Sequence, residues 1–181
     1  VMNKQREEIY SFRNEVLHIE NSLSLAREIL ESICIQMCHQ FFSSRNREDG
    51  WDPQGYTQWL HTHFPLTFDL KELATKKTLQ SFEQKIEHES QKIQQTQSLF
   101  TSADLDSAEK VLCQVVRRLL IRIIDRLWQE HLLHIDHLRS EVHLRAVGQK
   151  DPLMEFKHEA FALFDRLSLE IKQEIAHALF K

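Results

Sequence analysis

The sequence predicts an all-α protein, and three features carry this prediction. Glycine and proline, the residues that most often interrupt helices, occur three times each among 181 residues. Leucine, glutamate, glutamine, lysine and arginine, which favour long helices, are abundant. Apolar residues recur at steps of three and four over long stretches, which is the period of an amphipathic helix. No part of the chain requires a strand, and the hydrophobic content of 41% is enough for a packed core.

Charge and cysteine content narrow the class of protein. The formal net charge of -4 gives no sign of a general nucleic-acid binder, which is usually basic. No apolar run reaches the roughly 20 residues of a membrane-spanning helix, and the charged start VMNKQREEIY lacks the apolar core of a signal peptide. Three cysteines are too few for a disulfide framework, so we expect reduced thiols in a cytoplasmic protein. Because Val1 opens a segment already in helical register, we also expect a fragment of a longer protein.

The first expected helix runs from about residue 2 to about residue 18. Ile9, Phe12 and Val16 form one apolar stripe along it, and its other face is charged. Asn21-Ser22 then offers the N-cap of a second helix, which should end near Phe41-Phe42. The stripe of this second helix consists of Leu23, Ala26, Leu30, Ile33 and Met37.

A polar helical subdomain is expected to follow. The segment SSRNREDGWDPQGY is a loop by composition, and Asp52-Pro53 suits the start of a short helix. From about residue 69 to about residue 101 the chain has a helical pattern with sparse apolar positions, typical of a helix packed along a narrow seam. We therefore expect residues 22–101 to protrude as one helical subdomain.

Two long helices should complete the fold as an antiparallel hairpin. After a cap signal at residues 101–104, the first should run to about Arg145, and the second from Pro152 to Phe180. A connection of about six residues makes two such helices antiparallel neighbours, each roughly 40–60 Å long. The seam should include Val116, Leu120, Leu132, Ile135, Leu138 and Val142 on the first helix, and Leu153, Phe156, Ala160, Leu163, Leu167, Ile171, Ile175 and Ala178 on the second.

The tip of this hairpin carries an apolar residue among positive charges. Val147 lies between Arg139, Arg145 and Lys150 in sequence. Gly148 permits the left-handed residue that closes a helix, and Asp151-Pro152 suits the start of the next one. The valine either folds back onto its own helices or contacts a partner, and both readings stay open.

Four local patterns were weighed as sites. Residues 50–57, GWDPQGYT, fail the phosphate-loop motif, because tyrosine replaces its lysine and no strand precedes it. Glu130-His131, His134 and His137 lie one turn apart on a helix and could hold a metal, although solvated or capping histidines are the simpler interpretation. Cys34 and Cys38 favour buried thiols over a zinc site. The basic run Arg117-Arg118, Arg122 and Arg126 is typical of an exposed face with salt bridges, near Asp106, Glu109 and Asp125.

The opening block VMNKQREEIYSFRNEVL and the later blocks DRLWQEHLLHIDHLRSEVHLR and QKDPLMEFKHEAFALF together resemble the SecA family of bacterial preprotein translocase motor ATPases. VMNKQREEIYSFRNEVL is similar to the opening of the family's long scaffold helix. DRLWQEHLLHIDHLRSEVHLR followed by QKDPLMEFKHEAFALF is similar to its two-helix finger and return helix. The most specific matches are Leu127-Trp128, Glu130-His131, Asp136, Leu138-Arg139, His143-Leu144-Arg145 and Gln149-Lys150-Asp151-Pro152.

The resemblance implies three segments of a larger motor. These are the start of a scaffold helix (1–21), a helical wing (22–105), and a two-helix finger with the return helix of the scaffold (106–181). It implies that ATP, with Mg, binds to domains absent from this fragment, so that the fragment itself is not an enzyme and holds no cofactor or metal. The implied partners are a SecY-type channel, unfolded preprotein and the missing domains of the same chain, with no nucleic acid. The implied location is cytoplasmic and peripheral, at the inner face of the cell membrane.

The resemblance also assigns roles to named residues. Contact with substrate or channel at the finger tip is implied for Arg145, Ala146, Val147, Gly148 and Gln149. Bracing of the finger is implied for Trp128, Leu132, Ile135, Leu138 and Val142, and docking of the scaffold helix for Ile9, Phe12 and Val16. The family usually has an aromatic residue where this chain has Val147, so its tip would grip differently or elsewhere.

Two other interpretations remain open at this stage. A stand-alone helical adaptor explains the composition equally well, but it leaves both motif blocks to coincidence. A helical metalloenzyme would use His131, His134 and His137. Faces made for missing domains could also let the fragment self-associate.

Overall fold

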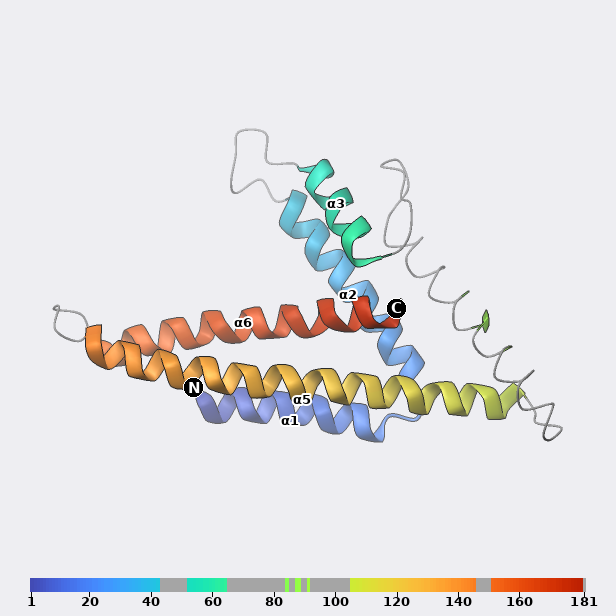
Figure 1. Cartoon of the computed structure of the whole chain (residues 1–181), viewed down its shortest axis with the longest axis horizontal. Coiled ribbons are helices and arrows are strands. Elements are labelled where there is room, and N and C mark those ends of the chain that lie inside the picture. Colours follow the sequence, from blue (N-terminus) through green and yellow to red (C-terminus); the bar gives the residue numbers. More distant parts are fainter. Residues whose placement is uncertain are drawn as a thin grey trace. The chain divides into compact units, whose positions relative to one another are not determined.

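The computed structural model describes residues 1–42, 52–64, 84, 87, 88, 91, 105–145 and 151–180. Within these residues the chain forms helices and no strand, which confirms the all-α prediction (Figure 1). The helices are α1 (Met2–His18), α2 (Ser22–Phe42), α3 (Pro53–His63), α5 (Leu105–Arg145) and α6 (Pro152–Leu179). Of the polar helix expected over residues 69–101, only residues 84, 87, 88 and 91 are described, and all four are helical.

The chain divides into two compact units. Unit 1 consists of Val1–Ile19 and Leu120–Ile171, and unit 2 of Glu20–Leu119 and Lys172–Lys181. Unit 1 therefore holds α1, most of α5 and most of α6, whereas unit 2 holds α2, α3 and the remaining ends of α5 and α6. The division into three segments at residues 21 and 105 stays a prediction.

Side-chain caps start three of the helices where the sequence places them. The Asn21 Oδ1 atom accepts hydrogen bonds from the backbone N–H groups of Leu23 and Ser24, at 3.0 and 3.1 Å. Asp52 caps α3 through Gly55 N at 2.8 Å, and Asp151 caps α6 through Leu153 N at 2.9 Å. These bonds satisfy amides that lack a partner in the first turn of a helix.

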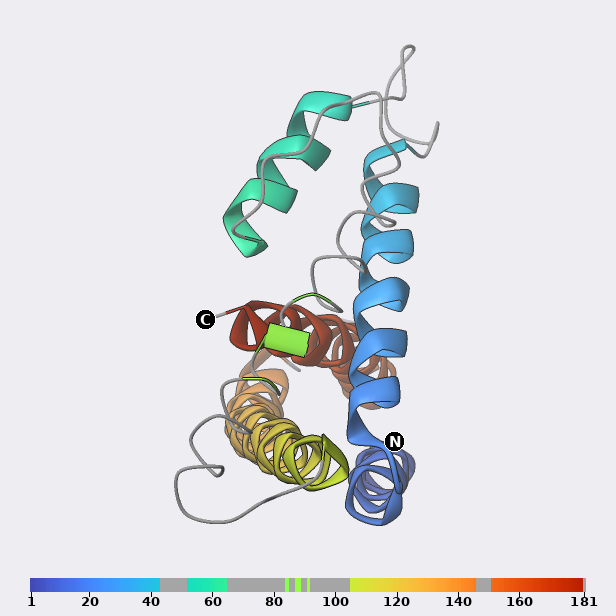
Figure 2. The ribbon, with the colours of Figure 1, turned by 90° about the vertical axis from the view of Figure 1, so that its right-hand side faces the viewer.

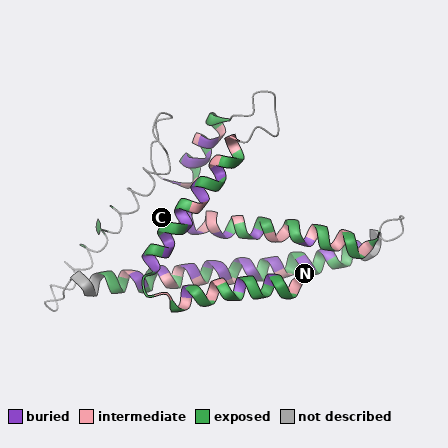
Figure 3. Ribbon diagram, turned by 180° about the vertical axis from the view of Figure 1, so that it is seen from behind, coloured by how far each residue is buried: buried purple, intermediate pink, exposed green. Residues whose placement is uncertain are grey.

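Unit 1 is a three-helix assembly with an apolar interior. Figure 2 shows α1, α5 and α6 nearly end-on, and their buried faces are visible in Figure 3. The buried apolar residues of this unit are Ile9, Val16, Leu120, Ile123, Ile124, Leu127, Trp128, Ile135, Leu138, Val142, Ala160, Leu167 and Ile171. The seam predicted from the 3.6-residue period is thus buried over most of its length.

One position of that seam was predicted wrongly. Leu153 is 58% exposed. Val1 and Met2, at the start of α1, pack against the cluster that contains Ala160, as Phe156 does. Leu153 lies almost one turn beyond Phe156 in α6, so α1 as described does not reach it.

Unit 2 contains the buried stripe of α2 and, at the end of that helix, a group of aromatic rings. Leu23, Ala26, Leu30, Ile33 and Met37 are all buried, as expected. The aromatic group consists of Phe41, Phe42, Tyr56, Trp59, Phe64 and Phe180, with neighbouring ring centroids 5.2–6.1 Å apart. Such spacings are typical of favourable aromatic contacts.

Candidate functional site

The predicted contact residues at the hairpin tip lie mostly outside the described residues. Arg145 is the last residue of α5, and α6 begins at Pro152. Ala146, Val147, Gly148 and Gln149 fall between them and are not described. The candidate site is therefore built from the two flanks of the hairpin and from α1.

The residues predicted to brace the hairpin mostly face its interior. Trp128, Ile135, Leu138 and Val142 are buried, with exposed fractions of 5–6%. Leu132 is only partly buried, because it lies toward the edge of the apolar stripe. The cluster of Ile135, Leu138, Val142 and Ala160 joins α5 to α6 below the tip. Burial of such residues on both helices resists bending of the hairpin.

The residues predicted to dock the scaffold helix also meet the hairpin. Ile9 and Val16 of α1 are buried, and Phe12 is half-buried. A fourth α1 residue, Gln5, belongs to the same face and is 2% exposed. Its spacing from Ile9 and Val16, four and eleven residues, is a helical period that could have identified it. A glutamine in a docking stripe is easily taken for a solvated residue, and sequence reasoning missed it.

Gln5 connects all three helices of unit 1. Its Nε2 atom donates a hydrogen bond to the backbone carbonyl oxygen of Ala160 in α6, at 2.9 Å. Its Oε1 atom lies 3.2 Å from His131 Nε2 in α5. A carbonyl oxygen only accepts, so the amide nitrogen of Gln5 must face Ala160 and its oxygen must face the imidazole. His131 consequently carries a proton on Nε2.

His131 is enclosed by rings as well as by Gln5. It is 3% exposed, its ring stacks on Trp128 at a centroid distance of 5.4 Å, and it meets Phe164 edge-on at 5.9 Å. Burial, and secondarily the neighbouring charge of His134, lowers the pKa of His131 from the ordinary histidine value of 6.5. The imidazole is therefore held neutral at physiological pH. The sequence-based interpretation of solvated or capping histidines is wrong for His131.

A second polar contact between α1 and α5 is an ion pair, about two turns beyond Gln5 in α1. The Arg13 guanidinium donates to both carboxylate oxygens of Asp125, through Nε at 2.7 Å and through its terminal nitrogen at 3.2 Å. This bond and the Asp125 charge raise the pKa of Arg13. Asp125, expected to pair within the basic face of its own helix, thus pairs with another helix. Within α5, Arg126 pairs instead with Glu130 at 3.2 Å, a partner that was not among the expected ones.

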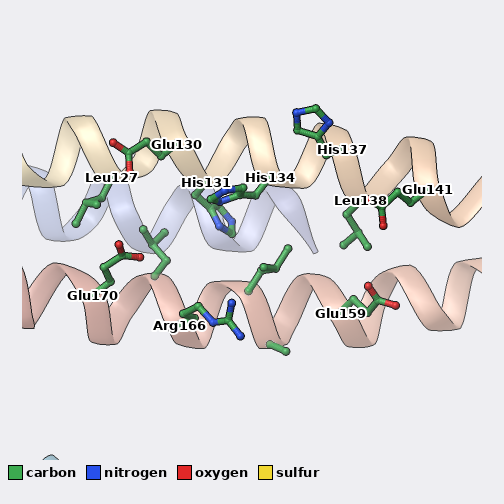
Figure 4. Close-up of a pocket in the computed structure, with 13 residues that line it drawn as sticks. Leu127, Glu130, His131, His134, His137, Leu138, Glu141, Glu159, Arg166 and Glu170 are labelled. Carbon is green, nitrogen blue, oxygen red and sulfur yellow. The ribbon is translucent and has the colours of Figure 1, made fainter.

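A groove of about 410 Å³ runs between α5 and α6 beside His131. Leucines of both helices line it, and Glu130, Glu141, Glu159, Arg166 and Glu170 supply its charged groups. In Figure 4, His131 and His134 lie between the two ribbons, whereas His137 points away from α6. The three histidines therefore do not converge, and no group of three metal-binding side chains is found within the described residues.

The other sequence candidates have plain structural roles where they are described. Cys34 is a buried cysteine outside any disulfide, and its backbone carbonyl accepts a hydrogen bond from the Tyr56 hydroxyl at 3.2 Å. Cys38 is half-buried and forms no disulfide either. Residues 52–57, the described part of the GWDPQGYT segment, form the cap and first turns of α3. No helix among the described residues is long and apolar enough to cross a membrane.

Comparison with known proteins gives a consistent result over the full length of the chain. The family described as SecA Wing and Scaffold domain matches residues 1–181. The chain is 40% identical, over 191 aligned positions covering all of it, to the protein translocase subunit SecA of Chlamydia pneumoniae. It is 37% identical to the subunits of the same name from Chlamydia caviae and Chlamydia felis, again over its whole length. The chain spans 19% of the length of each of these relatives.

Proposed function

The chain belongs to the SecA wing and scaffold domain family, and we propose that it is a non-catalytic mechanical part of a protein-export motor. In this proposal the scaffold helix and the hairpin brace the nucleotide-binding domains of the parent protein. The hairpin tip, residues 145–149, contacts the translocating preprotein at the mouth of a SecY-type channel. ATP and Mg would bind to other domains of the parent, which works at the inner face of the cell membrane.

The observation that best supports this proposal is the construction of the hairpin. Two long helices share a buried seam that extends to Val142, three residues before the end of α5. A third helix, α1, covers the same seam through Ile9, Val16 and Gln5. Close-packed helices of this length behave as a stiff rod, so displacement at the base would be carried to the tip.

The flanks of the hairpin also suit contact with other chain segments. Leu133, Met154 and Phe161 are 61%, 60% and 51% exposed, although large apolar residues are usually covered. Apolar contact is non-directional, so such residues can meet unfolded segments of varied sequence. The missing domains of the parent protein could cover the same residues.

Site-specific crosslinking from the tip tests the proposal. A photoreactive residue would replace Val147 in the full-length parent, in the presence of the channel and a stalled preprotein. We expect adducts with preprotein or channel. The matched control places the probe at His137, which points away from α6, and should give neither adduct in comparable yield. Adducts from position 147 that stay within the chain would show a valine folded back onto the hairpin and would refute the proposed tip contact.

A further inference from the structure

The seam of unit 1 contains one polar junction. Among the described residues of this unit, Gln5 and His131 are the buried polar side chains, at 2% and 3% exposure. Their neighbours along the seam are the apolar residues that join α1, α5 and α6. Buried polar groups require partners with correct geometry. This junction therefore restricts the relative positions of the helices more tightly than an apolar contact would.

Each of the three helices supplies one part of the junction. Helix α1 supplies the Gln5 amide, α5 the His131 imidazole, and α6 the backbone carbonyl of Ala160. Moving α1 along its axis by one residue would shift the amide by about 1.5 Å and turn it by about 100°. Both hydrogen bonds would then be lost inside an apolar seam. Apolar side chains tolerate such a slip much better, because their contacts are not directional.

We propose that Gln5, His131 and the Ala160 carbonyl form a polar lock that fixes the register of α1 against the α5–α6 hairpin, and that protonation of His131 loosens this lock. The neutral imidazole fits between Trp128 and Phe164 and donates from Nε2 to Gln5. A charged imidazolium in the same place would be shielded from water by two rings, which is unfavourable.

A protonated His131 ring can rotate toward the groove between α5 and α6. On α5, Glu130 and His134 line it beside His131, and on α6 the charged groups are Glu159, Arg166 and Glu170. Rotation toward this mixed, solvent-accessible surface would separate His131 Nε2 from Gln5 Oε1.

The third helix adds no charge that would hold the imidazolium in place. Helix α1 presents the uncharged Gln5 to His131, while the charged residues on either side of Gln5, Lys4, Arg6, Glu7 and Glu8, are exposed. Once the charged ring has turned away with its Nε2 proton, the Gln5 oxygen is left buried and unpaired, and α1 loses its register contact. All three parts of the lock lie in unit 1. A test of the lock is therefore independent of whether the hairpin tip contacts preprotein or channel.

The direction of the pH effect follows from the lowered pKa of His131. Unfolding or release of α1 restores the ordinary value near 6.5, so the released state binds a proton first as the pH falls. The lock is therefore complete above about pH 6.5 and weakens below it, until the pKa of the locked state is passed.

The test measures the lock on the purified 181-residue chain. NMR titration would follow the imidazole of His131, and hydrogen exchange, corrected for intrinsic rates, would follow the amides of α1 between about pH 8 and pH 5. We expect His131 to titrate below the ordinary histidine value of 6.5, and protection of α1 to fall over the same range. The fall should be roughly tenfold for each unit by which the two pKa values of His131 differ.

Three variants make the result decisive. His131→Gln keeps a side-chain donor but cannot titrate, so the pH dependence of amide protection in α1 should disappear. The matched control His137→Gln should retain that pH dependence.

Gln5→Glu places a carboxylate against the imidazole, so protection of α1 should instead rise as His131 is protonated. This variant keeps the question answerable if His131→Gln does not fold. Protection of α1 that stays constant while His131 titrates would overturn the proposal, as would equal behaviour of His131→Gln and His137→Gln.

Discussion

The helices of the two units are positioned by different kinds of contact. In unit 1, long helices pack along an apolar seam that would allow several registers, and the buried Gln5–His131 contact selects one of them. In unit 2, the short helix α3 is held against the end of α2 by rings, through Tyr56 against Phe41 and Phe42. The hydrogen bond from the Tyr56 hydroxyl to the Cys34 carbonyl adds to that packing. In unit 1 one buried side chain thus connects three helices, whereas in unit 2 aromatic packing positions a short one.

The largest expected effect comes from a core leucine in each unit. Leu127 and Leu30 are 2% and 0% exposed in units 1 and 2, respectively. Replacing either by alanine should lower the free energy of unfolding by about 2–5 kcal/mol, through lost burial and a cavity. Native-state hydrogen exchange should place the loss of protection in α1 and the middle of α5 for Leu127→Ala, and in α2 and α3 for Leu30→Ala. An identical loss in both units for both variants would show that the chain unfolds as a single cooperative body.

A smaller effect is expected at the polar junction. Gln5→Ala removes both hydrogen bonds and leaves the His131 donor buried, which should cost about 1–3 kcal/mol of unfolding free energy. The control Ser22→Ala deletes a buried hydroxyl that donates to the Cys113 carbonyl in unit 2. That carbonyl also lies within helix α5, so the control should cost less. Denaturant titration of both variants measures the difference, and an equal or larger cost for Ser22→Ala would contradict the special place of Gln5.

The smallest effect is expected for the ion pair between α1 and α5. Arg13 and Asp125 have side chains 34% and 42% exposed, so water and salt screen their attraction. A double-mutant cycle should give a coupling of about 0.2–1 kcal/mol that shrinks as salt is added. The Arg126–Glu130 pair within α5 is the matched control, and its side chains are 48% and 47% exposed. A coupling that is insensitive to salt would show that the interhelical pair is more enclosed than its exposed surface indicates.

Much of the fold was predictable because its signals are local. The helix starts at Asn21, Asp52 and Asp151 follow from cap chemistry that spans three residues. The stripe of α2 and most of the hairpin seam follow from the helical period. The exposure of Leu153 was missed because the level at which another helix ends is not a local property.

The candidate site was less predictable, for a physical reason. His131 looked like one member of a row with His134 and His137, since all three are spaced for the surface of a helix. Its burial depends on Gln5, 126 positions away, and on the ring of Phe164. A pattern within one helix cannot reveal a partner on another. The helices themselves follow from periodicity and cap signals, and the segments and tip-residue roles that the family resemblance implies stay predictions.

The hydrogen bond from Gln5 to Ala160 also bears on the order of folding, because 155 positions separate its partners. At synthesis rates of about 5–20 residues per second, roughly 8–30 s pass between the making of these two residues. The Tyr56–Cys34 contact, by contrast, spans 22 positions and can form almost at once. For most of that interval α1 carries an apolar face with neither partner helix complete, because α5 begins only at Leu105 and α6 follows it. We expect this face to be accessible to chaperones during that time, and their binding can be tested for at α1.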